Sequence, residues 1–439
     1  MSKSLALDAG WSPRIAWFRG SVHRSTCVAL VAMVSAALPT LMADGFRNPP
    51  DGPQAIGRIG GHIAQSDDVT AIVQNPANLP DAVRSPVGQM NVTAGYGRSR
   101  FTSQLTGASE ESQEPYAFLP SAYAATPLAG DKCVFGIAVH MPFGRATTWS
   151  DTGVFRYTAP HYTALTTVES TPVIASRLSP TLSVAVGLGY AWSMVEYHRF
   201  LPYSVGSGGA LPDAEMRLDG SGDGWRANGA IAWMPAEGQE LALTYKSAMK
   251  VRYDGDRRVD YTPPIPGAPD NSDVSTSITY PEVASAAYGV RIGKTFRVEA
   301  QVEWIAFSVY RELRIETGAD SETMPQDWKD TWTFGIGGDW RMTPEWTLRG
   351  GAMRLQSPVP DRTFTPSMAD QDQYVVSVGA GFRNGRHAFD VAYALGIIDD
   401  RNVRDSATVV ATPSGNLQPY NGNYEFDAHL LSVGYRISF

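Results

Sequence analysis

The sequence predicts an all-β fold, a transmembrane antiparallel β-barrel of about fourteen strands. The chain ends in an alternating apolar segment whose last residue is aromatic, Phe439. From about Ser85 onward, segments of alternating polarity are separated by alternately short and long connections, which is typical of an up-and-down barrel. After the N-terminal region, no segment reaches the run of roughly 18 apolar residues that a transmembrane helix needs. Membrane strands alternate in polarity, so they escape that criterion.

The first element, residues 1–43, is expected to be a signal peptide. A basic stretch is followed by an apolar core from Cys27 to Leu38 and by a cleavage site at Leu41-Met42-Ala43. The alternative is an N-terminal membrane anchor, which the short apolar core disfavours. The mature chain would begin at Asp44 and carry 32 basic against 43 acidic residues, so the formal net charge moves from -8 to -11. Such an acidic chain is not expected to bind nucleic acid.

Cysteine usage gives no sign of a metal or a disulfide. Cys27 would leave with the signal peptide, and Cys133 would then be alone. No Cys/His spacing resembles a zinc site, so neither a metal nor a cofactor is expected.

The second element, residues 44–84, does not alternate and is rich in Gly, Pro and small residues. A flexible linker could have this composition. Its length of about forty residues before the first strand favours a compact plug inside the barrel, here called the hatch. The residues expected to shape it are Gly60, Asp67, Asp68, Asn75, Pro76 and Ala77. In Asn75-Pro76-Ala77 the Asn side chain would cap nearby backbone groups and fix a turn.

The third element, residues 85–439, should be the barrel itself. Short turns are expected near 129–131, 179–181, 235–238, 293–295, 343–345 and 384–385. Longer polar connections are expected near 104–114, 145–160, 203–221, 255–274, 316–328, 358–370 and 398–422. Six short turns interleaved with seven long loops imply about fourteen strands, an even number as bacterial barrels require.

The two-faced strands fit a barrel but do not prove one. In residues 296–304, apolar side chains alternate with Arg297, Glu299, Gln301 and Glu303. A soluble sandwich would bury the apolar face, whereas a barrel in lipid turns it outward and keeps the charges in the lumen. The terminal strand, whose apolar face runs from Leu431 to Phe439, favours the barrel. A strand closed against the first strand leaves no free edge.

Several segments resemble the FadL-type outer-membrane transporters. These are Gly45-Phe46 with the hatch residues above, Met141-Pro142-Phe143-Gly144 with Phe155-Arg156-Tyr157, and Trp346 to Gly351 leading into Ser357 to Asp361. Together with the terminal strand, which resembles the signal read by the barrel-assembly machinery, the resemblance covers essentially the whole mature chain. It implies an outer-membrane barrel that takes up long-chain fatty acids or aromatic hydrocarbons passively and releases them sideways into the membrane near a kinked third strand.

The kink is expected at Pro142 and Gly144. Proline cannot donate a ladder hydrogen bond and glycine permits a bend, so inter-strand pairing should fail there. The alternative is that Pro142 simply ends a strand. The candidate ligand or channel residues are Phe46, His140, Pro142, Phe143, Gly144, Trp149 and Phe155. For Phe46 ordinary hatch packing, and for His140 an ordinary place in the barrel wall, remain alternatives.

Other functions remain open. A general diffusion porin is disfavoured by the hatch. The sequence has no phosphate-binding loop, no Gly-x-Ser-x-Gly and no His-Glu-x-x-His, so no catalytic residue is assigned and an enzyme is not expected. A lipid hydrolase whose triad is spread over several strands, or an adhesin, stays possible. We expect a monomer whose partners are hydrophobic small molecules and the lipid of the outer membrane.

Overall fold

The computed structural model describes residues 44–128, 132–261, 263–265, 271–318, 320–412 and 415–439. The expected signal peptide and the expected turn at 129–131 therefore lie outside the described residues. None of the described helices is long and apolar enough to cross a membrane.

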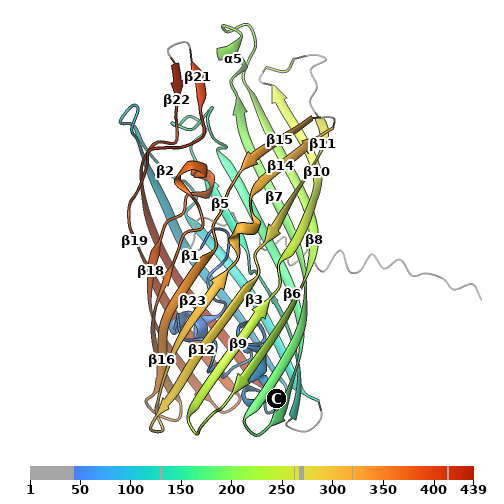
Figure 1. Cartoon of the computed structure of the whole chain (residues 1–439), viewed down its shortest axis with the longest axis vertical. Coiled ribbons are helices and arrows are strands. Elements are labelled where there is room, and N and C mark those ends of the chain that lie inside the picture. Colours follow the sequence, from blue (N-terminus) through green and yellow to red (C-terminus); the bar gives the residue numbers. More distant parts are fainter. Residues whose placement is uncertain (1–43, 129–131, 262, 266–270, 319, 413–414) are drawn as a thin grey trace, which may run out of the picture. The chain divides into compact units, whose positions relative to one another are not determined.

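Fourteen of the described strands form a closed antiparallel ring (Figure 1), which confirms the predicted fold class and strand number. The last strand pairs with the first from Val87↔Ser438 to Ser103↔Gly422, so the ring has no free edge. The strands of the ring, in order, are β1 (Val87–Ser103), β3 (Tyr116–Pro127), β4 (Cys133–His140), β6 (Tyr162–Ser179), β7 (Leu182–Leu201), β8 (Ala214–Trp233), β9 (Gln239–Lys246), β12 (Val283–Ile292), β13 (Phe296–Ile305), β16 (Thr331–Arg341), β17 (Trp346–Leu355), β18 (Gln373–Asn384), β19 (His387–Ile398) and β23 (Gly422–Ser438).

The ring has one end with short turns and one with long connections. The expected turns at 179–181, 235–238, 293–295, 343–345 and 384–385 all fall at or between strand ends, on the side where the chain terminates (Figure 1). At the opposite end several strands continue above the ring. The added strands are β2 (Ser109–Glu111), β5 (Gly144–Thr148), β10 (Met249–Tyr261), β11 (Asn271–Tyr280), β14 (Glu312–Thr317), β15 (Asp320–Pro325), β20 (Arg401–Val403), β21 (Val410–Thr412) and β22 (Gly415–Leu417).

These extensions correct six of the seven expected loops. The segments 104–114, 145–160, 203–221, 255–274, 316–328 and 398–422 were assigned to loops, but each contains strand residues, which belong in turn to β2, to β5, to β8, to β10 and β11, to β14 and β15, and to β20, β21 and β22. In the upper parts of β8 and β10 the outward side chains are polar, so the apolar alternation is lost there although the backbone still pairs. Short helical turns complete this end: α5 (Tyr203–Gly206), η3 (Phe307–Val309), η4 (Asp361–Thr363) and η5 (Pro366–Met368).

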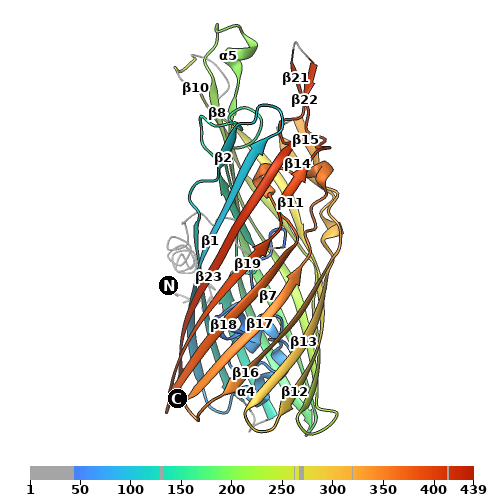
Figure 2. The same ribbon diagram turned by 90° about the vertical axis from the view of Figure 1, so that its left-hand side faces the viewer.

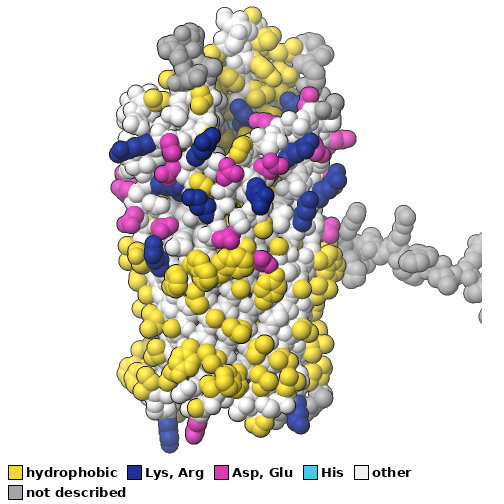
Figure 3. All heavy atoms as spheres, viewed as in Figure 1, with side chains coloured by type: hydrophobic (Ala, Val, Ile, Leu, Met, Phe, Trp, Pro, Cys, Tyr) yellow, Lys and Arg dark blue, Asp and Glu magenta, His cyan; other side chains and the backbone are white. Residues whose placement is uncertain are grey.

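The wall inverts the burial pattern of a soluble protein, because its polar side chains face inward and its apolar side chains face outward. In β1, Gln89, Asn91 and Thr93 are buried, while Met90 and Val92 are 70% and 42% exposed. Exposed apolar side chains of many strands form a broad belt on the face that Figure 3 shows, and most of the charged side chains on that face lie above it. A polar interior with an apolar exterior is stable only where lipid surrounds the wall.

The segment before β1 lies inside the lower half of the ring (Figure 2). It contains α2 (Pro53–Gly57), α3 (Ala71–Gln74), η1 (Pro76–Asn78) and α4 (Leu79–Ala82), and most of its residues are buried. The first helix packs on β17, β18, β19 and β23, and the others pack on β4, β6, β7 and β8. The lumen at this level is therefore filled by the chain's own N-terminal segment.

Candidate functional site

The third strand of the ring is interrupted where Pro142 predicted a kink. Three residues, Met141 to Phe143, separate β4 from β5, and they lie opposite only two residues of β6 between the pairs His140↔Glu169 and Gly144↔Thr166. The extra residue makes a bulge, which bends the strand.

The bend leaves a gap in the pairing of the wall. β3 pairs with β4 only from Ala122↔Val139 to Pro127↔Val134. Among the described residues, no pairing joins the rest of β3 to β5, and the next contact is the isolated bridge Gln113↔Thr148. The gap is thus closed on both sides and spans residues 116–121 of β3.

The N-terminus occupies the inner side of this kink. Phe46 accepts a backbone hydrogen bond from Gly144 at 2.9 Å, and the Asn48 N–H donates to the Pro142 carbonyl at 3.0 Å. The Asn48 side chain donates to the Met141 carbonyl at 2.9 Å. Peptide groups that the bend removes from the wall are therefore paired with the N-terminal segment.

Phe46 is the centre of an aromatic cluster. Its ring stacks on Trp328 at 5.0 Å and meets four further rings edge-on at 5.4 to 6.0 Å, those of Phe143, Tyr280, Phe307 and Tyr310. Gly45, with φ +62°, allows the approach, because a Cβ there would lie 2.5 Å from the Trp328 ring. The backbone N–H of Gly45 also donates to Asp370, and its carbonyl accepts from Arg145.

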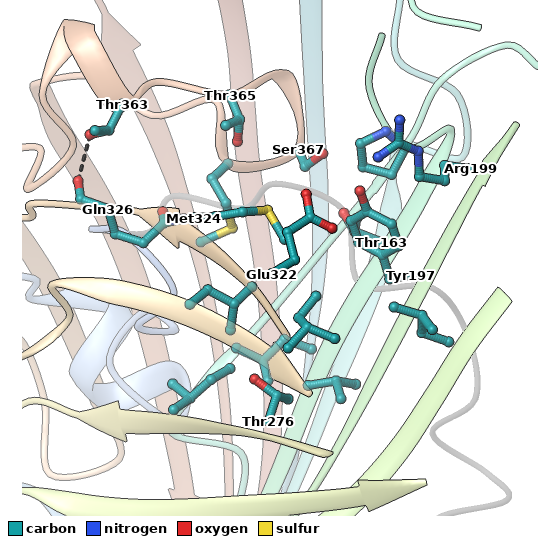
Figure 4. Close-up of a pocket in the computed structure, with 18 of the residues that line it drawn as sticks. Thr163, Tyr197, Arg199, Thr276, Glu322, Met324, Gln326, Thr363, Thr365 and Ser367 are labelled. Atoms are coloured by element: carbon teal, nitrogen blue, oxygen red, sulfur yellow. Dashed lines mark hydrogen bonds between the residues drawn. The ribbon is translucent and has the colours of Figure 1, made fainter. Parts of the chain in front are cut away.

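A cavity of about 900 Å³ lies above the cluster, between the extended strands and the long loops. Its apolar lining includes Phe46, Leu165, Val195, Ile278, Met324 and Met368. Charged residues also reach it, among them Arg199 and Glu322, which Figure 4 shows near Tyr197 and Ser367. The cavity is large enough for a drug-sized ligand, and its lining suits a molecule with a long apolar part and one polar end.

Of the seven candidate ligand or channel residues, Phe46 alone is among the residues that line this cavity. Pro142, Phe143 and Gly144 form the kink beneath it. Trp149 and Phe155 are 1% exposed and pack on each other at 4.8 Å beside the loops.

His140 faces inward as expected, but it lies in a polar cluster rather than at the cavity. Its ring nitrogens are 3.9 Å from a carboxylate oxygen of Asp51 and 3.9 Å from one of Glu169. Asp51 of the N-terminal segment also accepts hydrogen bonds from Ser121 and Tyr123 of β3. This cluster fastens the N-terminal segment to the strands on both sides of the gap.

The expected hatch residues make the contacts of a fixed plug. The Asn75 side chain accepts from the Ala77 N–H and donates to the Ile63 carbonyl, and Pro76 begins the following turn. Asp68 accepts from the backbone and hydroxyl of Thr70.

Charged wall residues hold the segment in place. Asp67 pairs with Arg297 at 2.7 Å, Arg58 pairs with Asp339 at 2.9 Å, and Arg47 pairs with Glu303 at 3.0 Å. Glu299 accepts three backbone N–H bonds from residues 63–65 at 2.7 to 2.9 Å. His62 is fully enclosed here, and burial lowers its pKa to about 4. The inward charges that the sequence displayed thus mainly bind this segment.

The cavity residues Arg199, Glu322 and Met324 were missed from the sequence. Arg199 comes from the upper end of the ring strand β7, and Glu322 and Met324 come from β15, one of the strands added above the ring. A signal was available in the charge of Arg199 near the end of β7, where the mainly apolar strand becomes polar with Glu196 and His198, but nothing in the sequence indicates that Glu322 and Met324 face it.

The chain matches the family described as outer membrane protein transport protein (OMPP1/FadL/TodX) over residues 42–439. It is 23% identical to a long-chain fatty acid transport protein of Escherichia coli strain CFT073 over 81% of this chain and 86% of that protein, and 22% identical to that of Salmonella typhi over 82% and 88%.

Solved structures agree in fold. A FadL homologue of Pseudomonas aeruginosa superposes with a TM-score of 0.76 at 20% identity, covering 90% of this chain and all of that one. The toluene transporter TodX of P. putida superposes with a TM-score of 0.68 at 13% identity, covering 89% of this chain and 98% of that one.

Proposed function

We propose, on the premise that this chain belongs to the OMPP1/FadL/TodX family of outer membrane transport proteins, that it carries hydrophobic molecules passively from outside the cell into the outer membrane. A ligand would enter the cavity between the loops, pass the Phe46 cluster and leave through the pairing gap between β3 and β5. The interrupted third strand carries this proposal, because a wall without inter-strand bonds can part at far lower cost than a paired one.

Long-chain fatty acids are the proposed substrates. The curated relatives that match most of this chain are long-chain fatty acid transport proteins. The cavity size agrees, because a void of about 150 Å³ already holds benzene, whereas this one measures about 900 Å³. Arg199 would face the carboxylate and the apolar lining would face the chain. Toluene-like hydrocarbons are the second candidates, since solved neighbours of this fold transport toluene.

We propose that residues 44–84 act as the hatch and residues 85–439 as the barrel, with residues 1–43 removed as a signal peptide. The hatch argues against a general porin, because its charged anchors and buried helices fill the lumen. The relatives are transport proteins, and we propose no catalytic role for this chain. A monomer assembled by the barrel-assembly machinery is proposed as well, since the ring closes within one chain.

Uptake of labelled oleate by cells that produce Pro142→Val with Gly144→Val tests the lateral route. The two changes favour a straight, paired strand, and uptake should fall at least ten-fold while the barrel stays folded. The matched control is Pro180→Val with Gly229→Val, which also removes one proline and one glycine but leaves the third strand unchanged; a Cβ at Gly229 would have its nearest neighbour at 3.8 Å.

Three outcomes would contradict the proposal. Unchanged uptake by the folded variant would exclude the lateral route. Failure of the unmodified protein to transport either oleate or toluene would exclude the function. A large steady ion conductance of the purified protein in a planar bilayer would instead indicate a porin.

A further inference from the structure

A cluster of metal-ligating side chains lies on β7 and β8 and at the end of the loop before β6, beside the cavity. His161, His198 and Glu215 each offer one ligand atom, and these atoms all lie within 4.8 Å of one another. Nε2 of His161 is 3.3 Å from Oε1 of Glu215. All three side chains are partly buried, with 14 to 20% exposure.

The strand register brings these residues together. In the pairing of β7 with β8, His198 lies opposite Arg217 and Phe200 lies opposite Glu215, so His198 and Glu215 share one face of the wall. Ser193 is fully buried and therefore faces inward. His198 lies five residues further along the strand, and an odd spacing puts it on the opposite, outer face. The His161 N–H donates to the His198 carbonyl at 2.9 Å, which fixes His161 beside the same strand.

The donor set selects a class of ion. Two imidazoles and one carboxylate suit Zn²⁺ and neighbouring first-row dications, whereas Mg²⁺ and Ca²⁺ prefer all-oxygen sites. Nδ1 of His161 is buried without a hydrogen-bond partner, so the ring is not held in a tautomer that protonates Nε2.

The surroundings permit a cation. Arg217 pairs with Oε2 of Glu215 at 2.7 Å, which leaves Oε1 directed at His161. Glu196 and Asp219 flank His198, the latter at 3.8 Å, and add negative charge next to the site.

We propose that His161, His198 and Glu215 bind one first-row transition dication, and that this ion clamps the connection of residues 149–161 to β7 and β8. That connection is a loop closed at its base by a bond from the Trp149 N–H to the His161 carbonyl at 2.7 Å. Tyr157, Thr158 and Pro160 of the loop line the cavity. An ion at its base would therefore hold one wall of the cavity in place. The site itself does not depend on the proposed transport function.

Zinc binding to the purified, chelator-treated full-length barrel, carried on a tag without histidine, tests the site. Titration calorimetry with Zn²⁺ should give one ion per chain. His161→Ala with His198→Ala should weaken binding at least ten-fold, and so should Glu215→Gln, which keeps the side-chain volume. His387→Ala is the matched control, because His387 bonds to Tyr435 on β23, away from the cluster, and should bind zinc like the unmodified protein.

Hydrogen exchange tests the clamp. Zinc should slow exchange of residues 149–161 in the unmodified protein and leave it unchanged in Glu215→Gln. The metal site is excluded if zinc shows no saturable binding, if Glu215→Gln binds as tightly as the unmodified protein, or if Mg²⁺ competes at equal concentration. Stoichiometric binding without slower exchange of the loop would overturn the clamp. If the double histidine variant fails to fold, Glu215→Gln decides alone.

Discussion

Gly60 lies where the N-terminal segment passes closest to the wall, and Gly60→Ala is expected to dislodge that segment. The φ of Gly60 is +86°, a conformation that L side chains rarely adopt. A Cβ at this position would lie 2.3 Å from the carbonyl oxygen of Ala352 in β17 and 2.7 Å from backbone atoms of Gly335 and Ile336 in β16. Because these are backbone atoms, no rotation of a side chain relieves the overlap.

The size of this overlap determines how much stability Gly60→Ala should lose. Ordinary contacts of a Cβ begin at 3.4 Å, so the segment must retreat by about 1 Å. That movement stretches the buried pair of Arg58 with Asp339, now at 2.9 Å. Breaking a buried pair costs about 3–5 kcal/mol, and the backbone strain of alanine at positive φ adds about 1–2 kcal/mol. The expected loss is therefore about 5 kcal/mol in the free energy of unfolding, unless the segment leaves the lumen.

Gly107→Ala is the control that separates the strain of a positive φ from the steric overlap at Gly60. Gly107 has φ +72°, and a Cβ added to it would meet no atom within 4 Å, so it shares the strain but not the overlap. Denaturant unfolding in lipid vesicles should show a loss of about 1–2 kcal/mol for this control and a much larger loss for Gly60→Ala. If the segment leaves instead, Gly60→Ala should conduct ions in a planar bilayer and the control should not. Equal stability and equal conductance of the two variants would refute the close packing of Gly60 on the wall.

Three further predictions concern Phe46, His62 and Arg199. Phe46→Ala should destabilise the protein by about 3–5 kcal/mol, less if the cluster collapses, and should lower oleate uptake; unfolding and uptake assays measure both, and an unchanged stability would contradict the packing. His62 has its pKa lowered from 6.5 to about 4 in the folded chain, so the unfolded chain binds more protons and stability should fall by about 3 kcal/mol as the pH drops from 6.5 to 4. His62→Gln should flatten that dependence in unfolding curves, and an identical slope would rule out His62 as its source. Arg199→Ala should raise the Kd for oleate about ten-fold, or about 1.4 kcal/mol, and leave toluene binding unchanged, and equal losses for both ligands in calorimetry would argue against a carboxylate contact.

Much of the wall could be predicted because apolar and polar side chains alternate along a strand that has lipid on one face and the polar lumen on the other. Residues 296–304 show apolar side chains outward and Glu299 and Glu303 inward, as the sequence indicated. The kink could be predicted for a local reason, since Pro142 lacks a donor. The hatch turn at Asn75 is equally local, because its side chain bonds to a backbone only two residues away.

The cavity and the metal cluster could not be predicted, since both depend on register between distant strands. Arg199 and Glu322 meet in one cavity from strands more than a hundred residues apart. His161, His198 and Glu215 have no motif spacing, and the absence of such spacing led to the expectation of no metal. The upper parts of β8 and β10 were assigned to loops because their outward side chains are polar, which removes the apolar period, although Ala214, Leu218 and Val259 are still buried and the backbone still pairs.

The kink in the third strand and the N-terminal segment are joined by hydrogen bonds and depend on each other. A bend in a membrane wall exposes peptide groups that lipid cannot satisfy, at a cost of several kcal/mol each. Here the Gly144 N–H donates to the Phe46 carbonyl, and the Pro142 carbonyl accepts from the Asn48 N–H. The bent third strand can therefore be unpaired with β3 and still have these peptide groups bonded, provided that the N-terminal segment stays in place. Because Phe46 also lines the cavity, a ligand that displaces its ring would act on the same backbone that bonds to Gly144, so under the proposed lateral route occupancy of the cavity is coupled to the gap in the wall.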